Sequence, residues 1–361
     1  MDKEKLTKSP NRLVGDLVLL CYLGGNPVPI IKNSLHKYVF YLLFCILLLI
    51  SAFLLSLRFG AAKIDFAAIG QAIFTTKHSA SIDLLREIRL PRSLAALIVG
   101  AALAIAGALI QGLTHNPIAE PSILGLSSGA YACYAFSLVL LPNQSYLITL
   151  IVCMLGATLT GWLVLGLANH RTQGLSPMRL ILTGAAISIL FNALAQMIGL
   201  SFQLTKDLSM WTASGVNGVN WAQLKVIFPF GLLGGALAFY IARPLTLLAL
   251  SEETAIGLGQ NIRKIRLISV LAIILLTASS VALAGNLTFV GLMIPQIIRR
   301  LVGSNYQRTL PLSALTGASF LMLADTIART IHAPYETPLI AIVSVVGFPF
   351  FIYLVKKEGT K

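Results

Sequence analysis

The stretch that decides the fold class is "RSLAALIVGAALAIAGALIQGL", residues 92–113. Beyond Arg92 it holds no charged residue, and it is long enough to cross the hydrocarbon core of a bilayer, which takes roughly 20 apolar residues. Its apolar residues run continuously and do not alternate, so it predicts a membrane helix and not a strand of a closed barrel. Small residues at every fourth position predict a flat face for close helix contact, namely Gly100, Ala104, Ala108 and Gly112.

Comparable runs recur along the whole chain. The 361 residues are 57% hydrophobic and 11% charged, and the mean hydropathy of +0.84 is far above that of a water-soluble domain. The sequence therefore predicts an all-α polytopic membrane protein. We expect about ten transmembrane helices, at 38–57, 92–113, 121–141, 145–168, 178–200, 223–248, 264–284, 288–303, 309–331 and 337–355.

The expected organisation is a cytoplasmic amino-terminal segment over 1–37, a transmembrane domain over 38–355 and a cytoplasmic tail over 356–361. The run 38–57 is long enough to span and lacks a small-residue cleavage site, so it predicts an uncleaved helix and not a signal peptide. With the amino terminus inside, most of the 27 lysines and arginines fall on the inner side.

The net charge of +14 is explained by inner loops beside anionic membrane lipid, and nucleic-acid binding is not needed to account for it. One outer segment departs from this distribution, because it is rich in cations. Its excess indicates a function on the outer face, and the residues are Arg58, Lys63, Lys77, Arg86, Arg89 and Arg92.

The sequence lacks the motifs expected of an enzyme or of a metal-binding protein. The four cysteines are scattered and the five histidines show no paired spacing, so neither a disulfide framework nor a metal site is expected. The G-x-x-x-x-G-K-[ST] pattern of a nucleotide-hydrolysing loop does not occur. A membrane enzyme would also need a clustered nucleophile, base or metal set, which the sequence does not offer.

Two stretches between the apolar runs carry strong local signals. In "QGLTHNPIAEPSILGLSSGA", residues 111–130, the prolines 117 and 121 break the helix. This stretch is either an ordinary Asn-Pro turn or irregular backbone enclosed by protein. The inner loop "RPLTLLALSEETAIGLGQNIRKIR", residues 243–266, predicts a short helix capped by Ser251, which is either a connector or a lever for an energy-supplying partner.

Polar residues within the spans suggest a transport path. Asn192, Gln196 and Met197 lie in the span 178–200 and Gln203 lies just beyond it. They line a path for a large, weakly charged solute or, equally, form hydrogen bonds between helices. Asp325 and Arg329 stand at i and i+4, as a structural or a functional pair. Buried carboxylates are otherwise scarce, which disfavours the alternative of an ion-coupled secondary transporter.

Four stretches in order resemble the permease subunits of type II ABC importers, which take up iron-siderophore complexes, haem and cobalamin. They are residues 88–130, "SEETAIGLG" at 251–259, "FVGLMIPQIIRRLVG" at 289–303 and "LADTIARTIHAPYETPL" at 323–339. The resemblance covers about 86–351. It implies that the chain is a transport subunit of a bacterial cytoplasmic membrane and not an enzyme, with an iron-siderophore complex as the first choice of cargo and haem or cobalamin as the alternative.

The partners are also implied by the resemblance. They are a second permease, either an identical copy or, preferably, a paralogue, two cytoplasmic ATPase subunits that hold ATP and Mg, and an extracytoplasmic substrate-binding protein. No cofactor is expected on this chain itself. Coupling helices at about 251–262 would contact the ATPase, through Ser251, Glu252, Glu253, Ala255, Gly257, Leu258 and Gly259.

Docking residues and structural positions follow in the same way. The family presents outer arginines to carboxylates of the binding protein, and the matching residues here are Arg89, Arg92 and Arg329. The chain departs from the family pattern at Gln296, where a histidine is usual, at His115 and at Ile340. The positions that carry the structural motif are Asn116, Pro117, Glu120, Pro121, Gly125, Gly129, Gly291 and Pro295.

Overall fold

The computed structural model describes residues 29–60, 64–75, 79–142, 144–170, 174–175, 177–333 and 335–358. The chain divides into two compact units, Met1–Phe44 and Cys45–Lys361. In the first unit, the described residues form the opening turns of α2 (Pro29–Arg58), which continues into the second unit. Most of the expected amino-terminal segment, the last residues of the tail, and Lys63 and Lys77 lie outside the described residues, and the expected domain boundaries stay a prediction.

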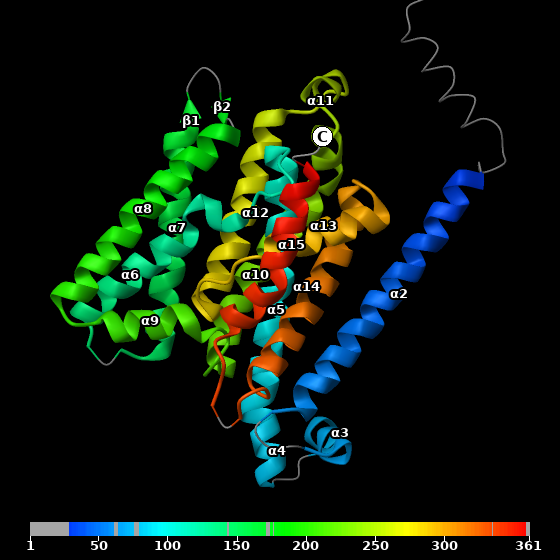
Figure 1. The fold of residues 1–361 in the computed structure, drawn as a ribbon. Coiled ribbons are helices and arrows are strands. Elements are labelled where there is room, and N and C mark those ends of the chain that lie inside the picture. Colours follow the sequence, from blue (N-terminus) through cyan, green and yellow to red (C-terminus); the bar gives the residue numbers. More distant parts are fainter. Residues whose placement is uncertain are drawn as a thin grey trace, which may run out of the picture. The chain divides into compact units, whose positions relative to one another are not determined.

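The second unit is built from helices (Figure 1). A two-residue antiparallel pair joins α7 to α8, with Asn169 opposite Leu175 and His170 opposite Gly174. The all-α prediction is confirmed. The elements are α3 (Phe66–Phe74), α4 (Ala80–Leu84), the π-helical η1 (Leu85–Arg89), α5 (Leu90–Thr114), the 3-10 helix η2 (Pro121–Leu124), α6 (Leu126–Leu140), α7 (Tyr146–Ala168), β1 (Asn169–His170), β2 (Gly174–Leu175), α8 (Pro177–Ser201), α9 (Thr205–Ser214), α10 (Trp221–Leu248), α11 (Glu252–Gly257), α12 (Ile262–Ala284), α13 (Val290–Val302), α14 (Tyr306–Ala328) and α15 (Leu339–Glu358).

Among the described residues, eight helices are long and apolar enough to cross a membrane. They correspond to eight of the ten expected spans. The expected spans 121–141 and 288–303 are occupied by α6, with 15 residues, and by α13, with 13 residues. Both are shorter than a bilayer-crossing helix, since roughly 20 residues are needed. A total of ten transmembrane helices therefore stays a prediction.

The second span begins earlier than expected. The prediction placed 58–91 outside the membrane helix, whereas α4, η1 and α5 form one continuous helix, Ala80–Thr114. Ser79 caps its start, because its side chain accepts a hydrogen bond from the Ile82 N–H at 3.4 Å. Pro91 would normally break such a helix by clashing with the preceding turn. The wider π-turn of η1 directly before it provides the space.

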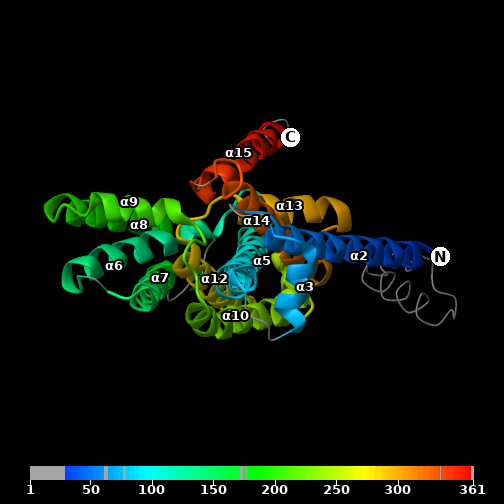
Figure 2. The ribbon, with the colours of Figure 1, turned by 90° about the horizontal axis from the view of Figure 1, so that it is seen from below.

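The core of the second unit is formed around α5, which is seen almost end-on in Figure 2, with α10, α12, α13 and α14 packed against it. In the helix Ala80–Thr114 and in α12, 78% of the most apolar stretch is buried, against 22% in α8. The small-residue face is confirmed, because a Cβ on Gly100 would lie 2.3 Å from the Gly317 carbonyl oxygen. Glycine lets α5 and α14 approach this closely.

Candidate functional site

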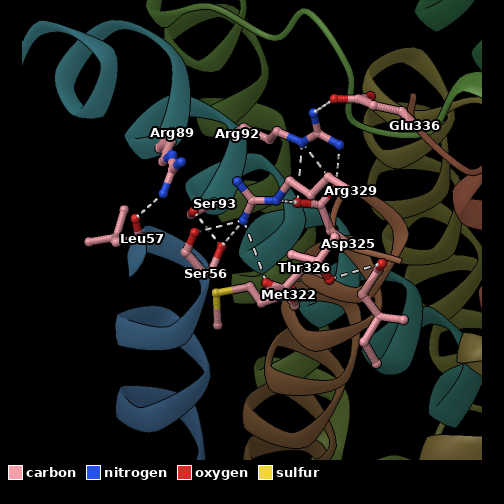
Figure 3. A network of polar contacts seen from close by, with 12 residues as sticks. Ser56, Leu57, Arg89, Arg92, Ser93, Met322, Asp325, Thr326, Arg329 and Glu336 are labelled. Carbon is pink, nitrogen blue, oxygen red and sulfur yellow. Dashed lines mark hydrogen bonds and ion pairs between the residues drawn. The ribbon is translucent and has the colours of Figure 1, made fainter. Parts of the chain in front are cut away.

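A network of buried charges joins the amino-terminal end of α5 to the carboxyl-terminal end of α14 (Figure 3). Arg92 donates from Nη2 to Asp325 Oδ1 at 2.8 Å and from Nε to both Asp325 oxygens, at 3.0 and 3.2 Å. Its Nη1 donates to Glu336 Oε1 at 2.6 Å. One guanidinium thus engages two carboxylates, which are the partners that its fork of N–H groups fits best.

The other two predicted arginines belong to the same network. Arg329 lies 3.2 Å from Asp325, between Nε and Oδ2, and its Nη2 donates to the Ser56 carbonyl oxygen at 2.7 Å. Arg89 donates from Nη1 to the carbonyl oxygens of Leu57 and Arg58 at 2.7 and 2.9 Å. These carbonyls lie at the carboxyl-terminal end of α2, where a cation is favoured. The network ties the ends of α2, α5 and α14 together.

The three arginines are not a free cationic surface. Arg89, Arg92 and Arg329 are 4%, 8% and 6% exposed. None of the three therefore presents a free charge at the surface of the described chain, because their guanidinium groups are bonded to partners within it. The burial of Arg92 cannot be predicted from the residues near it in the sequence, since its partners Asp325 and Glu336 lie more than 230 positions away. Their docking role stays a prediction, and Glu336 is the partner that sequence reasoning missed.

The structural motif residues meet where α5 crosses α13. Gln111 donates from Nε2 to the carbonyl oxygens of Gly291 and Leu292 at 3.2 and 3.1 Å. Gln296 donates from Nε2 to the Pro117 carbonyl oxygen at 2.7 Å and to Gln111 Oε1 at 3.1 Å. The amide nitrogen of the glutamine that departs from the family pattern thus makes two hydrogen bonds, and the stretch 111–130 is anchored to α13 and is not an isolated turn.

The remaining members of this motif show why the chain departs from a helix here. Asn116 accepts from the Ile118 N–H at 3.0 Å through Oδ1, an Asx turn that suits its place before Pro117. Gly125 has φ of 71°, a left-handed conformation that favours glycine. The other glycines allow close packing, since a Cβ on Gly291 would lie 2.9 Å from Pro121 and one on Gly129 would lie 1.8 Å from Thr160. Pro295 lies buried within α13.

Glu120 lies outside the helices that are long enough to cross a membrane, directly before η2. Its side chain contacts the start of α13. It accepts a hydrogen bond from the Phe289 N–H at 2.5 Å. Phe289 has φ of 69° and precedes the first helical residue, Val290. Burial raises the pKa of Glu120 to about 7, against the opposite effect of the hydrogen bonds from Phe289 and Ser122. A negative charge here suits the amino-terminal end of α13.

The predicted short helix at 251–262 is confirmed as α11, with one correction. Ser251 Oγ accepts from the Thr254 N–H at 3.0 Å, and Glu252 and Glu253 occupy the first turn. The correction is that the described residues here form one six-residue helix and not several, followed by a turn in which Gly259 has φ of 76°. Glu252 pairs with Arg266 of α12, which fixes α11 to the membrane part.

α11 and the residue after it expose two large apolar side chains beside the exposed Glu252 and Glu253. Ala255 is buried, whereas Ile256 and Leu258 are 61% and 59% exposed. Gly257 is also exposed and has open space beside it. Two exposed aliphatic side chains on one turn of a polar loop form a small surface suited to a partner protein. The sequence signal for α11 was its cap. Leu258 is among the expected coupling residues, whereas Ile256 was missed.

The predicted path residues separate into two groups. Asn192 and Gln196 line a pocket of about 400 Å³ together with residues of η2, α6, α9 and the segment before α13. Met197 and Gln203 do not line it, and both are exposed. The prediction grouped four residues by proximity in the sequence, but a helix turns the neighbours Gln196 and Met197 to different faces, and Gln203 lies beyond the end of α8. Sequence reasoning missed the wall formed by Ser188 and Trp211.

Comparison with known proteins agrees with the motifs and the fold. A model of the FecCD transport family matches residues 47–357, which is most of the chain. The chain belongs to this family. Among its relatives is the iron(3+)-hydroxamate import system permease protein FhuB of Bacillus subtilis (strain 168), 40% identical over 313 residues, covering 86% of this chain and 81% of the relative.

Two further comparisons extend the same result. The Fe(3+) dicitrate transport system permease protein FecD of Escherichia coli (strain K12) is 35% identical and covers 86% of this chain and 96% of its own length. A solved structure of an ABC transporter of the metal-chelate type, in an inward-facing conformation, matches with a TM-score of 0.76 and 30% identity, over 89% of this chain and 99% of that chain.

This FecCD-family chain is therefore an ABC importer permease, a multi-pass component of the cytoplasmic membrane and not an enzyme. At two of its three departures from the family pattern, the residue present makes polar contacts. Gln296 is bonded to Gln111 and Pro117, as described above, and His115 Nε2 lies 2.9 Å from the Leu248 carbonyl oxygen. Leu248 ends α10 and leads into α11, so His115 links the end of α5 to the loop before α11.

Proposed function

We propose that this permease translocates an iron-siderophore complex in an importer driven by a separate ATPase, with haem or cobalamin as alternative cargo. The names of the relatives support a ferric chelate as cargo, since one imports an iron(3+)-hydroxamate and another an Fe(3+) dicitrate. A polar pocket with exposed amides in a membrane helix also suits a solute that forms many hydrogen bonds.

The proposal includes four partners and an orientation. Two ATPase subunits, which hold ATP and Mg, act at α11, and a binding protein docks at the end that carries Arg89, Arg92 and Arg329. The second permease is a paralogue, because the differences at Gln296, His115 and Ile340 suit one half of a heterodimer. Both chain termini lie in the cytoplasm, in accordance with the distribution of lysine and arginine.

The observation that carries the proposal is the surface of α11. This short, capped helix lies at the end of the second unit away from α3 and α4 (Figure 1). Ile256 on it and Leu258 directly after it are exposed. It is held by the Glu252–Arg266 ion pair at the start of α12. A push on α11 is therefore passed to a core helix, so that nucleotide binding in the ATPase can shift the balance between two access states.

A reconstituted complex tests the proposal. The permease, its neighbouring ATPase, second permease and binding protein are placed in lipid vesicles, and uptake of a radioactive ferric chelate is followed with ATP on the ATPase side. We expect uptake that requires ATP. The double variant Ile256→Asp and Leu258→Asp should lose most chelate-stimulated ATP hydrolysis while the protein still inserts and remains monodisperse. Leu141→Asp, an exposed aliphatic residue outside α11, is the matched control and should keep coupling.

Two results would contradict the proposal. Uptake driven by a proton gradient in vesicles that lack the ATPase would identify an ion-coupled carrier. Normal coupling in the double variant would show that α11 is only a connector between α10 and α12.

A further inference from the structure

The pocket of about 400 Å³ is lined by hydroxyl and amide side chains from elements far apart in the sequence. Its walls come from η2 and α6, from α8, from α9 and from the segment before α13. We propose that it is a binding subsite for an electroneutral ferric chelate with many hydrogen-bonding groups, and that it discriminates against polyanionic chelates. Its main polar residues are Ser122, Ser127, Ser128, Ser188, Asn192 and Gln196.

The part of the pocket formed by α8 is a polar stripe. Ser188, Asn192 and Gln196 are spaced by four residues and therefore lie on one face of the helix. They extend from the middle of the candidate span Met178–Ser201 into its second half. Other faces of α8 expose apolar side chains, for example Ile189, which is 73% exposed. Exposed amides are costly against lipid, so a stripe of them at this depth indicates a solvated or ligand-filled space.

The pocket offers hydrogen-bonding capacity to a ligand. Ser128 and Ser188 donate their hydroxyl protons to the carbonyl oxygens of Gly125 and Gly184, each at 2.7 Å, so their oxygens remain acceptors. Asn192 and Gln196 are exposed and, within the described part of the chain, make no hydrogen bond, so each amide can both donate and accept. A ligand with N–H, O–H and carbonyl groups matches this set.

Charge selects the class of chelate. Of the described residues that line the pocket, none carries a charge. The nearby carboxyl of Glu120 is bonded to the Phe289 N–H and is not part of the lining. A multiply charged anion would lose hydration here without gaining a cation, which is unfavourable in a low-dielectric site. The dipole of α6 favours negative charge, but a partial charge does not balance a whole anion.

Electroneutral chelates satisfy this condition. Three hydroxamate groups each lose one proton and together balance the charge of Fe³⁺, whereas citrate chelates of iron keep a net negative charge. The pocket should therefore bind a hydroxamate chelate more tightly than a citrate chelate. This inference rests on the proposed function, because the preference matters only if a ferric chelate is the cargo.

An aromatic partition separates this pocket from a larger one. Trp211 lines both, and the second pocket, of about 770 Å³, also contains Tyr134 and Asp207. Trp211 stacks on Tyr131 with ring centroids 5.9 Å apart and on Tyr134 at 5.3 Å. The carboxylate of Asp207 beside the partition further disfavours an anionic ligand. The position of Trp211 also makes its fluorescence a reporter of binding.

The test measures binding to the full chain alone in lipid nanodiscs, without ATPase or binding protein. Trp162→Phe and Trp221→Phe leave Trp211 as the single tryptophan, since the chain has three. Ferric tris-acetohydroxamate, a neutral chelate, is titrated, and the additional variant Trp211→Phe provides the inner-filter correction. We expect saturable quenching with Kd below about 1 mM. Asn192→Ala with Gln196→Leu should weaken binding by about tenfold, because two hydrogen bonds are lost.

Two controls show whether an effect on binding comes from the pocket itself and whether the pocket selects by charge. Met197→Ala, one position from Gln196 but outside the pocket, should bind as the parent does. Ferric citrate should bind at least about tenfold more weakly than the neutral chelate, and Gln196→Lys should reverse this order.

Three results overturn the inference: no saturable quenching up to about 1 mM, equal weakening by Met197→Ala, or equal binding of citrate and hydroxamate chelates. Any of these can occur while the complete complex imports ferric chelates with ATP, which leaves the proposed function standing. Saturable quenching in the single-tryptophan chain, lost on pocket substitution, supports the subsite even where vesicle uptake fails.

Discussion

Arg92 and Asp325 form a buried ion pair between the start of α5 and the end of α14, with Nη2 2.8 Å from Oδ1. Asp325 is fully buried, and Arg329 one turn further along the same chain contacts its other oxygen at 3.2 Å. A buried carboxylate is tolerated when cations and hydrogen bonds surround it, and removing one partner exposes the full cost of desolvation. The pair therefore fixes how the two core helices meet.

Asp325→Asn should lower stability strongly, because two buried arginines then lack their shared counter-charge. We expect a loss of about 3 kcal/mol or more in the free energy of unfolding. Thermal unfolding in detergent, followed by size-exclusion chromatography, measures the change. Asp207→Asn, at an exposed carboxylate, is the control and should have little effect. An equal shift in both variants would mean that the pair does not support the fold.

Glu336 offers a test of docking that leaves the core intact. Its side chain is 39% exposed and lies 2.6 Å from Arg92 Nη1, while Asp325 holds the other side of the guanidinium. A carboxylate of the binding protein must therefore compete with Glu336. Glu336→Gln should strengthen docking by up to about fivefold at low salt, the scale of a partly exposed ion pair.

Association of the purified binding protein with nanodisc-embedded permease complex measures this effect. Glu253→Gln on α11 removes the same charge from an exposed site on a different loop and should leave docking unchanged. If Glu336→Gln weakened docking, Glu336 would itself contribute to the docking surface and would not compete for Arg92.

Features set by local sequence could be predicted, whereas features set by distant partners could not. Continuous apolar runs identified the helices, since burial in lipid demands them. The second span was expected to begin at residue 92, directly after Pro91, because the π-turn that accommodates this proline within a longer helix depends on φ and ψ and has no residue signature. The burial of Arg92 was not predictable, since its partners Asp325 and Glu336 come from a distant segment.

The same limit applies to the other sites. Ser251 was identified as a helix cap because a cap is a local feature that residue type and spacing reveal. The pocket was only half identified. Asn192 and Gln196 are polar residues within an apolar run, which draws attention, but Ser188 and Trp211 join them only once the helices pack. Sites that depend on packing of distant elements require the structure.

Close contact at Gly107 predicts a steric effect on the core. A Cβ there would lie 1.8 Å from the Gly291 carbonyl oxygen of α13, so either α5 or α13 must move. Gly107→Ala should lower stability by about 1–3 kcal/mol and reduce the yield of folded protein. Gly166→Ala is the matched control, because open space surrounds it. Melting temperatures of the two variants measure the difference, and equal values would contradict the packing of α5 on α13.

Glu120→Gln should reveal the titration of the buried carboxyl. Its folded pKa of about 7 lies above the unfolded value, which is about 4.3. As the pH rises between these values, the unfolded state ionises first, so the parent protein loses stability progressively and the loss is complete above about pH 7. Glutamine keeps an acceptor for the Phe289 N–H but does not titrate.

The stability advantage of Glu120→Gln should therefore grow by about 2 kcal/mol between pH 5 and pH 8. Melting temperatures in detergent across this range measure it. Glu87→Gln, at an exposed glutamate, should show no such trend. An advantage that shrinks as the pH rises would mean that the carboxylate form is the one the native state favours, held by the amino-terminal end of α13 and the Phe289 N–H strongly enough to outweigh burial.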